Sequence, residues 1–201
     1  MRIGEIVETC SVSFTAQSDL HQPPPLGSLV KIEMESETGQ SAGGKLYAVV
    51  SFAQTTGLEP GRPAIRRGTD DVYDSAIYEE HPELRRTLRT VFQGVMVGWQ
   101  DKNRLYQHLP PQPPPLHYSV RECDASEVKL FSDKLYYLRL LLSTTIDLPV
   151  PLLVTAHINQ TYRVRGEDQA WIEGVARELA TLLKQDSEML MSILYAIDPS
   201  A

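Results

Sequence analysis

Apolar and polar residues alternate with a period of two over the first quarter of the chain. The pattern runs in four short pieces separated by turn residues: "RIGEIVET", "SVSFTAQ", "SLVKIEM" and "KLYAVVSFA". Such alternation is typical of β-strands that bury one face. Because no helical segment separates these pieces, they predict an antiparallel meander or a small barrel rather than parallel βαβ units.

The middle of the chain interrupts this pattern and then resumes it. The Gly- and Pro-rich stretch "GLEPGRPAIRRGTDD" reads as a loop, and one or two short helices follow between about residues 70 and 90. Strand-like sequence returns in "TVFQGVMVGWQ" and in "HYSVREC". We therefore predict, over residues 1–123, a small six-stranded antiparallel β-barrel with a helical insertion.

The apolar period changes to 3.6 at Asp124, which forms an Asp-x-x-Glu capping box with Glu127. An amphipathic helix of about 20 residues is predicted by apolar residues at steps of three and four: Val128, Phe131, Leu135, Leu138 and Leu142. Further helices are expected from about Glu167 to Lys184 and in "SEMLMSILYAI", whereas residues 147–165 are ambiguous and are interpreted as a short helix. The predicted fold class is α+β, with a helical domain over residues 124–201.

Two proline clusters have the same form. "PPPLGSLV" begins at Pro23, and "PPPLHYSV" begins 90 positions later at Pro113. Proline fixes φ and favours extended geometry in the preceding residue, so each cluster predicts a stiff approach to a strand. The alternative is a polyproline ligand for an aromatic groove on a partner.

The stretches "IGEIVETCSVSFTAQ", "PPPLGSLVKIE" and "KLYAVVSFA", in this order, resemble the HAS barrel, the six-stranded barrel of HerA-type DNA translocases and rotary ATP synthase subunits. The resemblance covers residues 2–53 and resumes over 90–122, with His117 where the first proline cluster has Gly27. It implies a barrel that makes protein contacts. In that family the barrels lie side by side in rings, so it also implies self-association or docking onto a translocase.

The motor domain of such translocases carries a Gly-x4-Gly-Lys-Ser/Thr phosphate loop. The most similar stretch here, "SAGGKLY", lacks the first glycine and has Leu46 where the hydroxyl residue belongs, so it reads as a hairpin turn. We expect no ATP binding and no other cofactor.

Composition and charge narrow the function classes. The chain is 42% hydrophobic, has a formal net charge of −7, and contains two cysteines, Cys10 and Cys123. No apolar run approaches the roughly 18 residues of a membrane span, and the N-terminus lacks a signal-peptide core. With too few cysteines for a disulfide framework, we expect a cytoplasmic protein that does not contact membranes.

Candidate catalytic and metal-binding groups each have a simpler structural explanation. A carboxylate-rich segment fits no known metal-ligand spacing and reads as a solvated helix start: Asp70, Asp71, Asp74, Glu79, Glu80 and His81. The Glu127-x-Lys129 pair of a nuclease site coincides with the capping box. His157 has no nucleophile elbow, so it reads as structural. We expect neither a metal site nor enzymatic activity.

Two arginine clusters remain as candidate contacts with nucleic acid or an acidic partner. One is in the loop, at Arg62, Arg66 and Arg67, and the other is on the predicted helix, at Arg85, Arg86 and Arg89. The alternative is a solvated surface on which neighbouring glutamates pair with them.

The strand "KLYAVVSFA" is apolar on both faces, so both should be covered. The candidate protein interface is Tyr47 and Val49, and their cover is either the C-terminal helices or a second copy of the chain. The sequence thus favours a non-enzymatic assembly or adaptor protein. The alternatives are a DNA-processing accessory factor that contacts nucleic acid through the arginines, and an enzyme with an unrecognised site.

Overall fold

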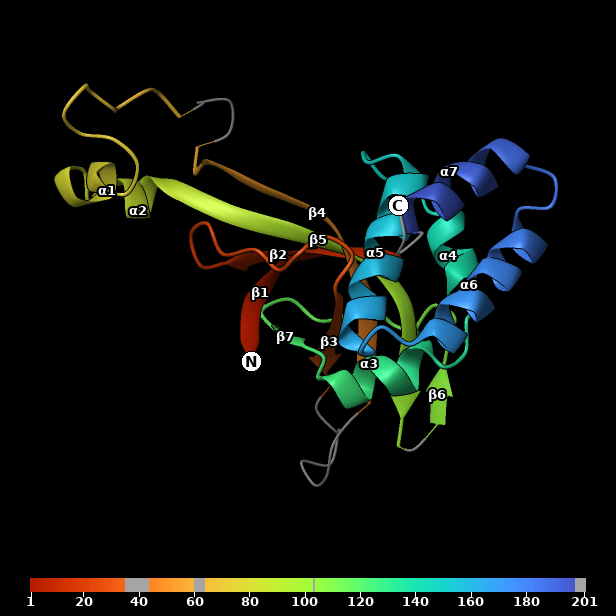
Figure 1. The fold of residues 1–201 in the computed structure, drawn as a ribbon. Coiled ribbons are helices and arrows are strands. Elements are labelled where there is room, and N and C mark those ends of the chain that lie inside the picture. Colours follow the sequence, from red (N-terminus) through yellow and green to blue (C-terminus); the bar gives the residue numbers. More distant parts are fainter. Residues whose placement is uncertain (35–43, 60–63, 103, 198–201) are drawn as a thin grey trace.

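The protein is an α+β fold in which a ring of antiparallel strands precedes a helical region (Figure 1). The computed structural model describes residues 1–34, 44–59, 64–102 and 104–197. The strands are β1 (Arg2–Thr9), β2 (Ser13–Ser18), β3 (Leu29–Glu33), β4 (Lys45–Gly57), β5 (Leu88–Asp101), β6 (Arg104–Tyr106) and β7 (Ser119–Glu122). The helices are α1 (Ala76–Glu80), α2 (Leu84–Thr87), α3 (Ala125–Ser132), α4 (Leu138–Leu142), α5 (Val150–Val164), α6 (Gln169–Leu182) and α7 (Ser187–Ile197).

Six strands close into a ring. They pair in the order β2-β1-β7-β3-β4-β5, and β2 also pairs with β5 from Ser13↔Val95 to Ser18↔Thr90. The short strand β6 adds to the end of β5 outside the ring. The six predicted strands are therefore confirmed, and β6 is an additional strand that the sequence reading missed.

Alternate residues of the ring strands fill its interior. Every ring strand contributes to one buried cluster, which comprises Ile6, Phe14, Ala16, Val30, Ile32, Leu46, Ala48, Val50, Phe92, Met96 and Val120. This is the inward face that a period of two produces in a small barrel. The pattern of the sequence and the interior of the fold agree.

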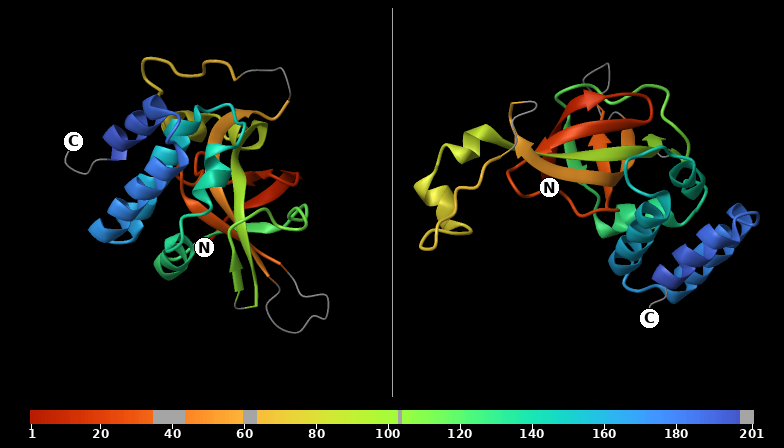
Figure 2. Two further views of the ribbon diagram at one scale, coloured as in Figure 1. Left: turned by 90° about the vertical axis from the view of Figure 1, so that its right-hand side faces the viewer. Right: turned by 90° about the horizontal axis from the view of Figure 1, so that it is seen from above.

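The outer face of β3, β4 and β5 forms a second core with the helices. Leu29, Tyr47, Val49, Val95 and Val97 belong to one buried cluster with residues of α3 to α7. Figure 2 shows α3 to α7 gathered on one side of the ring. The helices are therefore the cover of the two-faced strand, one of the two alternatives that the sequence left open.

The two proline clusters have the same local structure. Each leads to a residue with positive φ, Gly27 at +82° and His117 at +66°, and β3 or β7 begins two residues later. The Gly27 N–H donates to the Val50 carbonyl at 2.8 Å, and the His117 N–H donates to the Ile6 carbonyl at 2.9 Å. In return, the Val50 N–H donates to the Ser28 carbonyl, and the Ile6 N–H donates to the Tyr118 carbonyl, both at 3.0 Å. The prediction that each cluster leads into a strand is confirmed.

The strands that follow the two proline clusters lie side by side in the ring. Strands β3 and β7 are antiparallel neighbours, and Lys31 pairs with Arg121. These two residues are 90 positions apart, the offset between the clusters, so equivalent residues meet at the centre of the pair. The two clusters are thus related by an approximate local two-fold axis.

The predicted 20-residue helix after Asp124 is wrong. Its capping box is present, but α3 ends at Ser132 and α4 begins at Leu138. Side chains from elsewhere bind the carbonyls at the break: Gln107 donates to Phe131 at 2.6 Å and to Lys134 at 2.8 Å, and Trp171 donates to Ser132 at 2.8 Å. These tertiary bonds replace the i+4 amides that a longer helix would supply.

Of the remaining helix predictions, two are confirmed and one gave too short a helix. Helices α6 and α7 are confirmed near their expected bounds. The ambiguous segment 147–165 holds α5, a 15-residue helix with Pro151 in its first turn, rather than a short one. Five of its residues are buried, among them Leu153 and Ile158. It is the helix that packs most centrally against the others.

Candidate interaction site on the arm

The outer halves of β4 and β5, with the segment between them, project from the ring as an arm (Figure 1). We define the arm as the described residues 53–59 and 64–92. Its ladder runs from Ala53↔Phe92 to Gly57↔Leu88, and α1 and α2 lie at its far end. Figure 2 shows this end on the side of the ring away from the helical region. The helices α3 to α7 do not cover the far end of the arm.

The arm brings both arginine clusters to one end of the molecule. Arg66 and Arg67 lie in the loop before α1, and Arg85 and Arg86 lie on α2; all four are exposed. Within the described residues, none of the four forms an ion pair. Arg62 lies outside the described residues.

Arg89 differs from its neighbours in the sequence cluster. Helix α2 ends at Thr87, and Arg89 lies on β5 opposite Thr56, partly buried. The prediction that Arg89 lies on the same helix as Arg85 and Arg86 is therefore wrong, because the chain becomes extended at Leu88.

A pocket of about 390 Å³ lies at the end of the arm ladder. Its lining joins the loop, through Ile65 and Arg67, to Leu58 just after β4 and to Leu84 on α2. Leu58 and Ile65 are 51% and 67% exposed, and Tyr73 nearby in the sequence is 63% exposed. Large apolar side chains on a projecting element are typical of a protein-binding surface.

The arm is tied to the ring by contacts of His21. Its Nε2 lies 2.5 Å from the Tyr78 hydroxyl on α1, and its backbone N–H donates to Thr90 Oγ1 at 2.8 Å. At the far end of the ladder, the Leu58 N–H donates to the Thr87 carbonyl. The two contacts of His21 fix the direction of the arm relative to the ring.

The arm is not basic overall. Its acidic side chains outnumber the described arginines, and they are Glu59, Asp70, Asp71, Asp74, Glu79, Glu80 and Glu83. Phosphate binding requires an excess of positive charge over at least one face. The charge of the arm therefore favours a protein partner over nucleic acid.

Tyr47 and Val49 do not face a partner in this structure. They are 2% and 0% exposed and pack against the helices, with the Tyr47 ring 4.9 Å from that of Phe131. The chain's own helices cover this surface, which is the first of the two covers that the sequence left open.

The residues considered for chemistry have structural contacts. Glu127 Oε1 accepts from Lys31 Nζ and Lys45 Nζ, both at 2.7 Å, while its Oε2 accepts from the Asp124 N–H. Burial acts to raise the pKa of Glu127, but the two lysines outweigh it and the pKa is lowered. Lys129 is exposed on the next turn. Glu127 thus joins α3 to β3 and β4.

His157 is enclosed between the first proline cluster and the helices. Its Nδ1 lies 2.7 Å from the Gly27 carbonyl, and its Nε2 lies 3.0 Å from the Tyr137 hydroxyl. A carbonyl can only accept, so Nδ1 carries the proton and neutral Nε2 accepts from Tyr137. Burial lowers the pKa of His157 to about 4. The imidazole of His157 therefore links the ring of strands, at Gly27, to α5.

Among the described residues, no group of three or more His, Cys, Asp and Glu side chains could hold a metal ion. Both cysteines are free, and burial raises the pKa of Cys123 far above its usual range. None of the described helices is long and apolar enough to cross a membrane.

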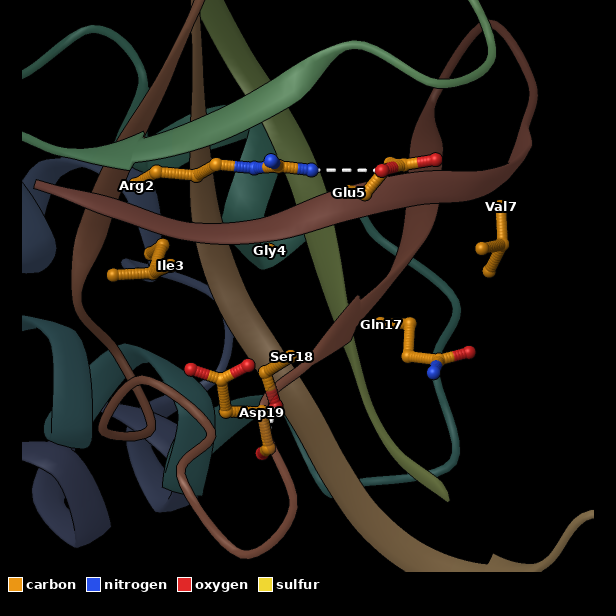
Figure 3. Close-up of a pocket in the computed structure, with 8 residues that line it drawn as sticks. All are labelled: Arg2, Ile3, Gly4, Glu5, Val7, Gln17, Ser18 and Asp19. Carbon is orange, nitrogen blue, oxygen red and sulfur yellow. Dashed lines mark hydrogen bonds and ion pairs between the residues drawn. The ribbon is translucent and has the colours of Figure 1, made fainter. Parts of the chain in front are cut away.

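A second concave surface, of about 470 Å³, crosses β1 and β2 (Figure 3). Figure 3 shows the Arg2 and Glu5 side chains pointing toward one another, and Arg2 Nη2 donates to Glu5 Oε2 at 2.7 Å. The guanidinium in this groove is therefore already paired, and Asp19 lies in the loop beyond β2.

The sequence reading missed the apolar residues of the arm. Leu58 and Ile65 lie in a Gly- and Pro-rich loop. In such a loop, an isolated large apolar side chain is the only local sign of a binding surface. Their position beside α2 requires the tertiary structure. No protein-family model matches the chain, and no curated protein matches its sequence.

Proposed function

We propose that this protein is a non-enzymatic assembly or adaptor factor that binds a protein partner through the arm. The observation that carries the proposal is the exposure of Ile65 and Tyr73 on an element that projects away from the body. Exposed arginines beside apolar groups add to it, because arginine and aromatic residues are enriched at interface centres.

The resemblance to HAS barrels extends this proposal to the class of partner. It implies docking onto a DNA translocase, since in that family the barrel adjoins the motor domain, or association of copies of the chain. A cytoplasmic location is part of the proposal, and the two free cysteines support it.

The test is quantitative capture from a lysate of the source cell. The bait variant Ile65→Ser/Tyr73→Ser removes the apolar contacts of the arm, and Leu130→Ser/Tyr195→Ser is the matched control, because those residues are 56% and 70% exposed on α3 and α7. We expect a defined protein to be enriched by wild type and control and lost at least about 10-fold by the arm variant. Equal recovery by all three baits would refute the proposal.

A second candidate is contact with nucleic acid, which is favoured by the exposure of Arg66, Arg67, Arg85 and Arg86 and by their lack of an ion pair with any described residue. Anisotropy of a labelled single-stranded DNA at about 50 and 200 mM salt tests it, because phosphate contacts give an affinity that falls steeply with salt. The four-fold Arg→Gln variant should abolish the signal. Absence of binding at the lower salt concentration would exclude this candidate.

A further inference from the structure

The outer end of the arm has no core of its own. We define the arm tip as the described residues 57–59 and 64–89; none of them is buried, whereas the next residue, Thr90, is only 1% exposed. The two helices of the arm tip have five and four residues, and neither begins with a side-chain cap. Helices this short depend on tertiary packing for their stability. An apolar group that packed into the arm tip would therefore stabilise it.

The pocket at the end of the arm ladder is the place where such a group fits. Its volume of about 390 Å³ is within the range of binding pockets in proteins. Leu58 and Leu88 line it at the end of the ladder, and Leu84 lines it from α2. On the loop side it is lined by Ala64 and by Ile65, which is 67% exposed. The side chains that form this apolar wall are therefore accessible to a group from another molecule.

Positive charge predominates around this apolar wall. Four exposed arginines line the pocket or adjoin a lining residue in the chain, and they are Arg66, Arg67, Arg85 and Arg86. The acidic residues in equivalent places are Glu59 and Glu83, and Glu83 Oε1 lies 3.4 Å from His81 Nδ1. The other acidic residues of the arm, from Asp70 to Glu80, do not line the pocket. The pocket therefore complements a carboxylate, although the arm as a whole is acidic.

We infer that this pocket binds a peptide segment of the partner in which a large apolar side chain stands beside a carboxylate. The inference rests on the proposed function, and it specifies the chemistry of the segment that the arm recognises. The apolar side chain would lie between Ile65 and Leu84, and the carboxylate would accept hydrogen bonds from the Arg67 guanidinium, whose fork of donors matches it. An apolar anchor with a polar rim is the usual construction of the sites that carry most of the affinity of a protein interface.

The probe is a phage-displayed library of random peptides of about 12 residues, selected on the whole 201-residue chain. We expect the enriched peptides to share a large apolar residue beside Asp or Glu. One enriched peptide is then synthesised with a fluorescent label, and its dissociation constant is measured by anisotropy. Replacing its carboxylate by the corresponding amide should weaken binding at least about 10-fold, because a hydrogen bond to a charged group is lost.

Three variants of the chain test where the peptide binds. Arg67→Glu reverses a charge in the pocket, Leu84→Ser removes an apolar contact, and Arg177→Glu is the matched control, because Arg177 is exposed on α6. We expect the first two variants to weaken peptide binding at least about 10-fold and the control to leave it unchanged. In Arg67→Glu, the amide form of the peptide should bind no more weakly than the carboxylate form, because that carboxylate has lost its partner. In the wild type, the peptide should slow hydrogen exchange of amides in residues 64–88.

The inference would be overturned by a library that yields no enriched peptide, by enriched peptides without a carboxylate, or by a peptide that binds Arg67→Glu as tightly as wild type. If capture from the lysate still required Ile65 and Tyr73, the proposed function would stand and only the chemistry of the segment would be refuted. Peptide binding at the pocket without any captured protein would support the chemistry of the pocket and refute the proposed function.

Discussion

Gly27 and His117 occupy equivalent places in the two proline clusters, yet only one of them must be glycine. Both have positive φ, which is costly for most residues with a Cβ. A Cβ on Gly27 would lie 2.4 Å from the Ala156 carbonyl carbon and 2.4 Å from the His157 nitrogen. The His117 side chain is 78% exposed instead. The close approach of α5, not the turn itself, demands glycine.

We predict that Gly27→Ala lowers the free energy of unfolding by at least about 2 kcal/mol, from backbone strain together with displacement of α5. Gly166→Ala is the matched control, because Gly166 has a φ of +77° and nothing within 4 Å of an added Cβ. Urea unfolding of both variants measures the difference. Equal losses would show that the contact with α5 contributes nothing.

The buried imidazole of His157 predicts a pH dependence. The pKa is lowered from 6.5 to about 4 in the folded state, so the unfolded state takes up the proton first as pH falls. The contribution of neutral His157 is complete above pH 6.5 and is lost as pH falls from there toward 4. The slope within this window approaches about 1.4 kcal/mol per pH unit.

Urea unfolding between pH 7.5 and 5 measures this slope above the range in which carboxylates titrate. His157→Gln should be less stable at pH 7.5, because its amide cannot reproduce both hydrogen bonds of the imidazole, and should lose most of the pH dependence. A slope that persists in the variant would assign it to other groups.

At the scale of elements, α3 is attached to the ring by a carboxylate that also completes its cap. Glu127 is 12% exposed and binds Lys31, which is 14% exposed, and Lys45. The cap alone would position only the start of the helix. The two ammonium groups orient α3 across β3 and β4.

Glu127→Gln keeps the shape of the side chain and removes its charge, which leaves two lysines without their shared carboxylate. We expect a loss of about 2 kcal/mol in the free energy of unfolding. Lys129→Gln, exposed on the same helix, should change it by less than about 0.5 kcal/mol. Thermal and urea unfolding of both variants compare the two. Similar losses would mean that the ion pairs do not stabilise the docking of α3.

At the scale of the whole molecule, β3, β4 and β5 contribute side chains to two cores, one inside the ring and one between the ring and the helices. Leu46, Ala48 and Val50 fill the ring, while Tyr47 and Val49 pack against the helices. The division into domains at residues 1–123 and 124–201 stays a prediction. The shared outer core implies that the ring would expose these apolar side chains if the helices were removed.

Val49→Asp should therefore unfold or strongly destabilise the protein, by at least about 3 kcal/mol, since Val49 is fully buried in the outer core. Val7→Asp is the control, because Val7 lies exposed on β1. Circular dichroism during thermal unfolding distinguishes them. A Val49→Asp variant of unchanged midpoint would contradict the packing of the helices on β4.

The arm shows why candidate residues were only partly predictable. The arginines are visible in the sequence as short clusters. The two clusters lie at the same end of the molecule because Gly57 pairs with Leu88, 31 positions later in the chain. The pocket between Ile65 and Leu84 depends on the same closure. Tyr47 and Val49 were recognised as needing a cover, and only the packing identified that cover as the helices.

The sequence by itself determined the strand period, the capping box at Asp124 and the stiff approaches to β3 and β7, because each depends on residues a few positions apart. The tertiary structure decided the break between α3 and α4, where Gln107 and Trp171 take the carbonyls that would continue the helix. It also decided that Gly27, unlike His117, lies against a helix. Local patterns fix backbone conformation, whereas the partners of a side chain are set by contacts between residues far apart in the chain.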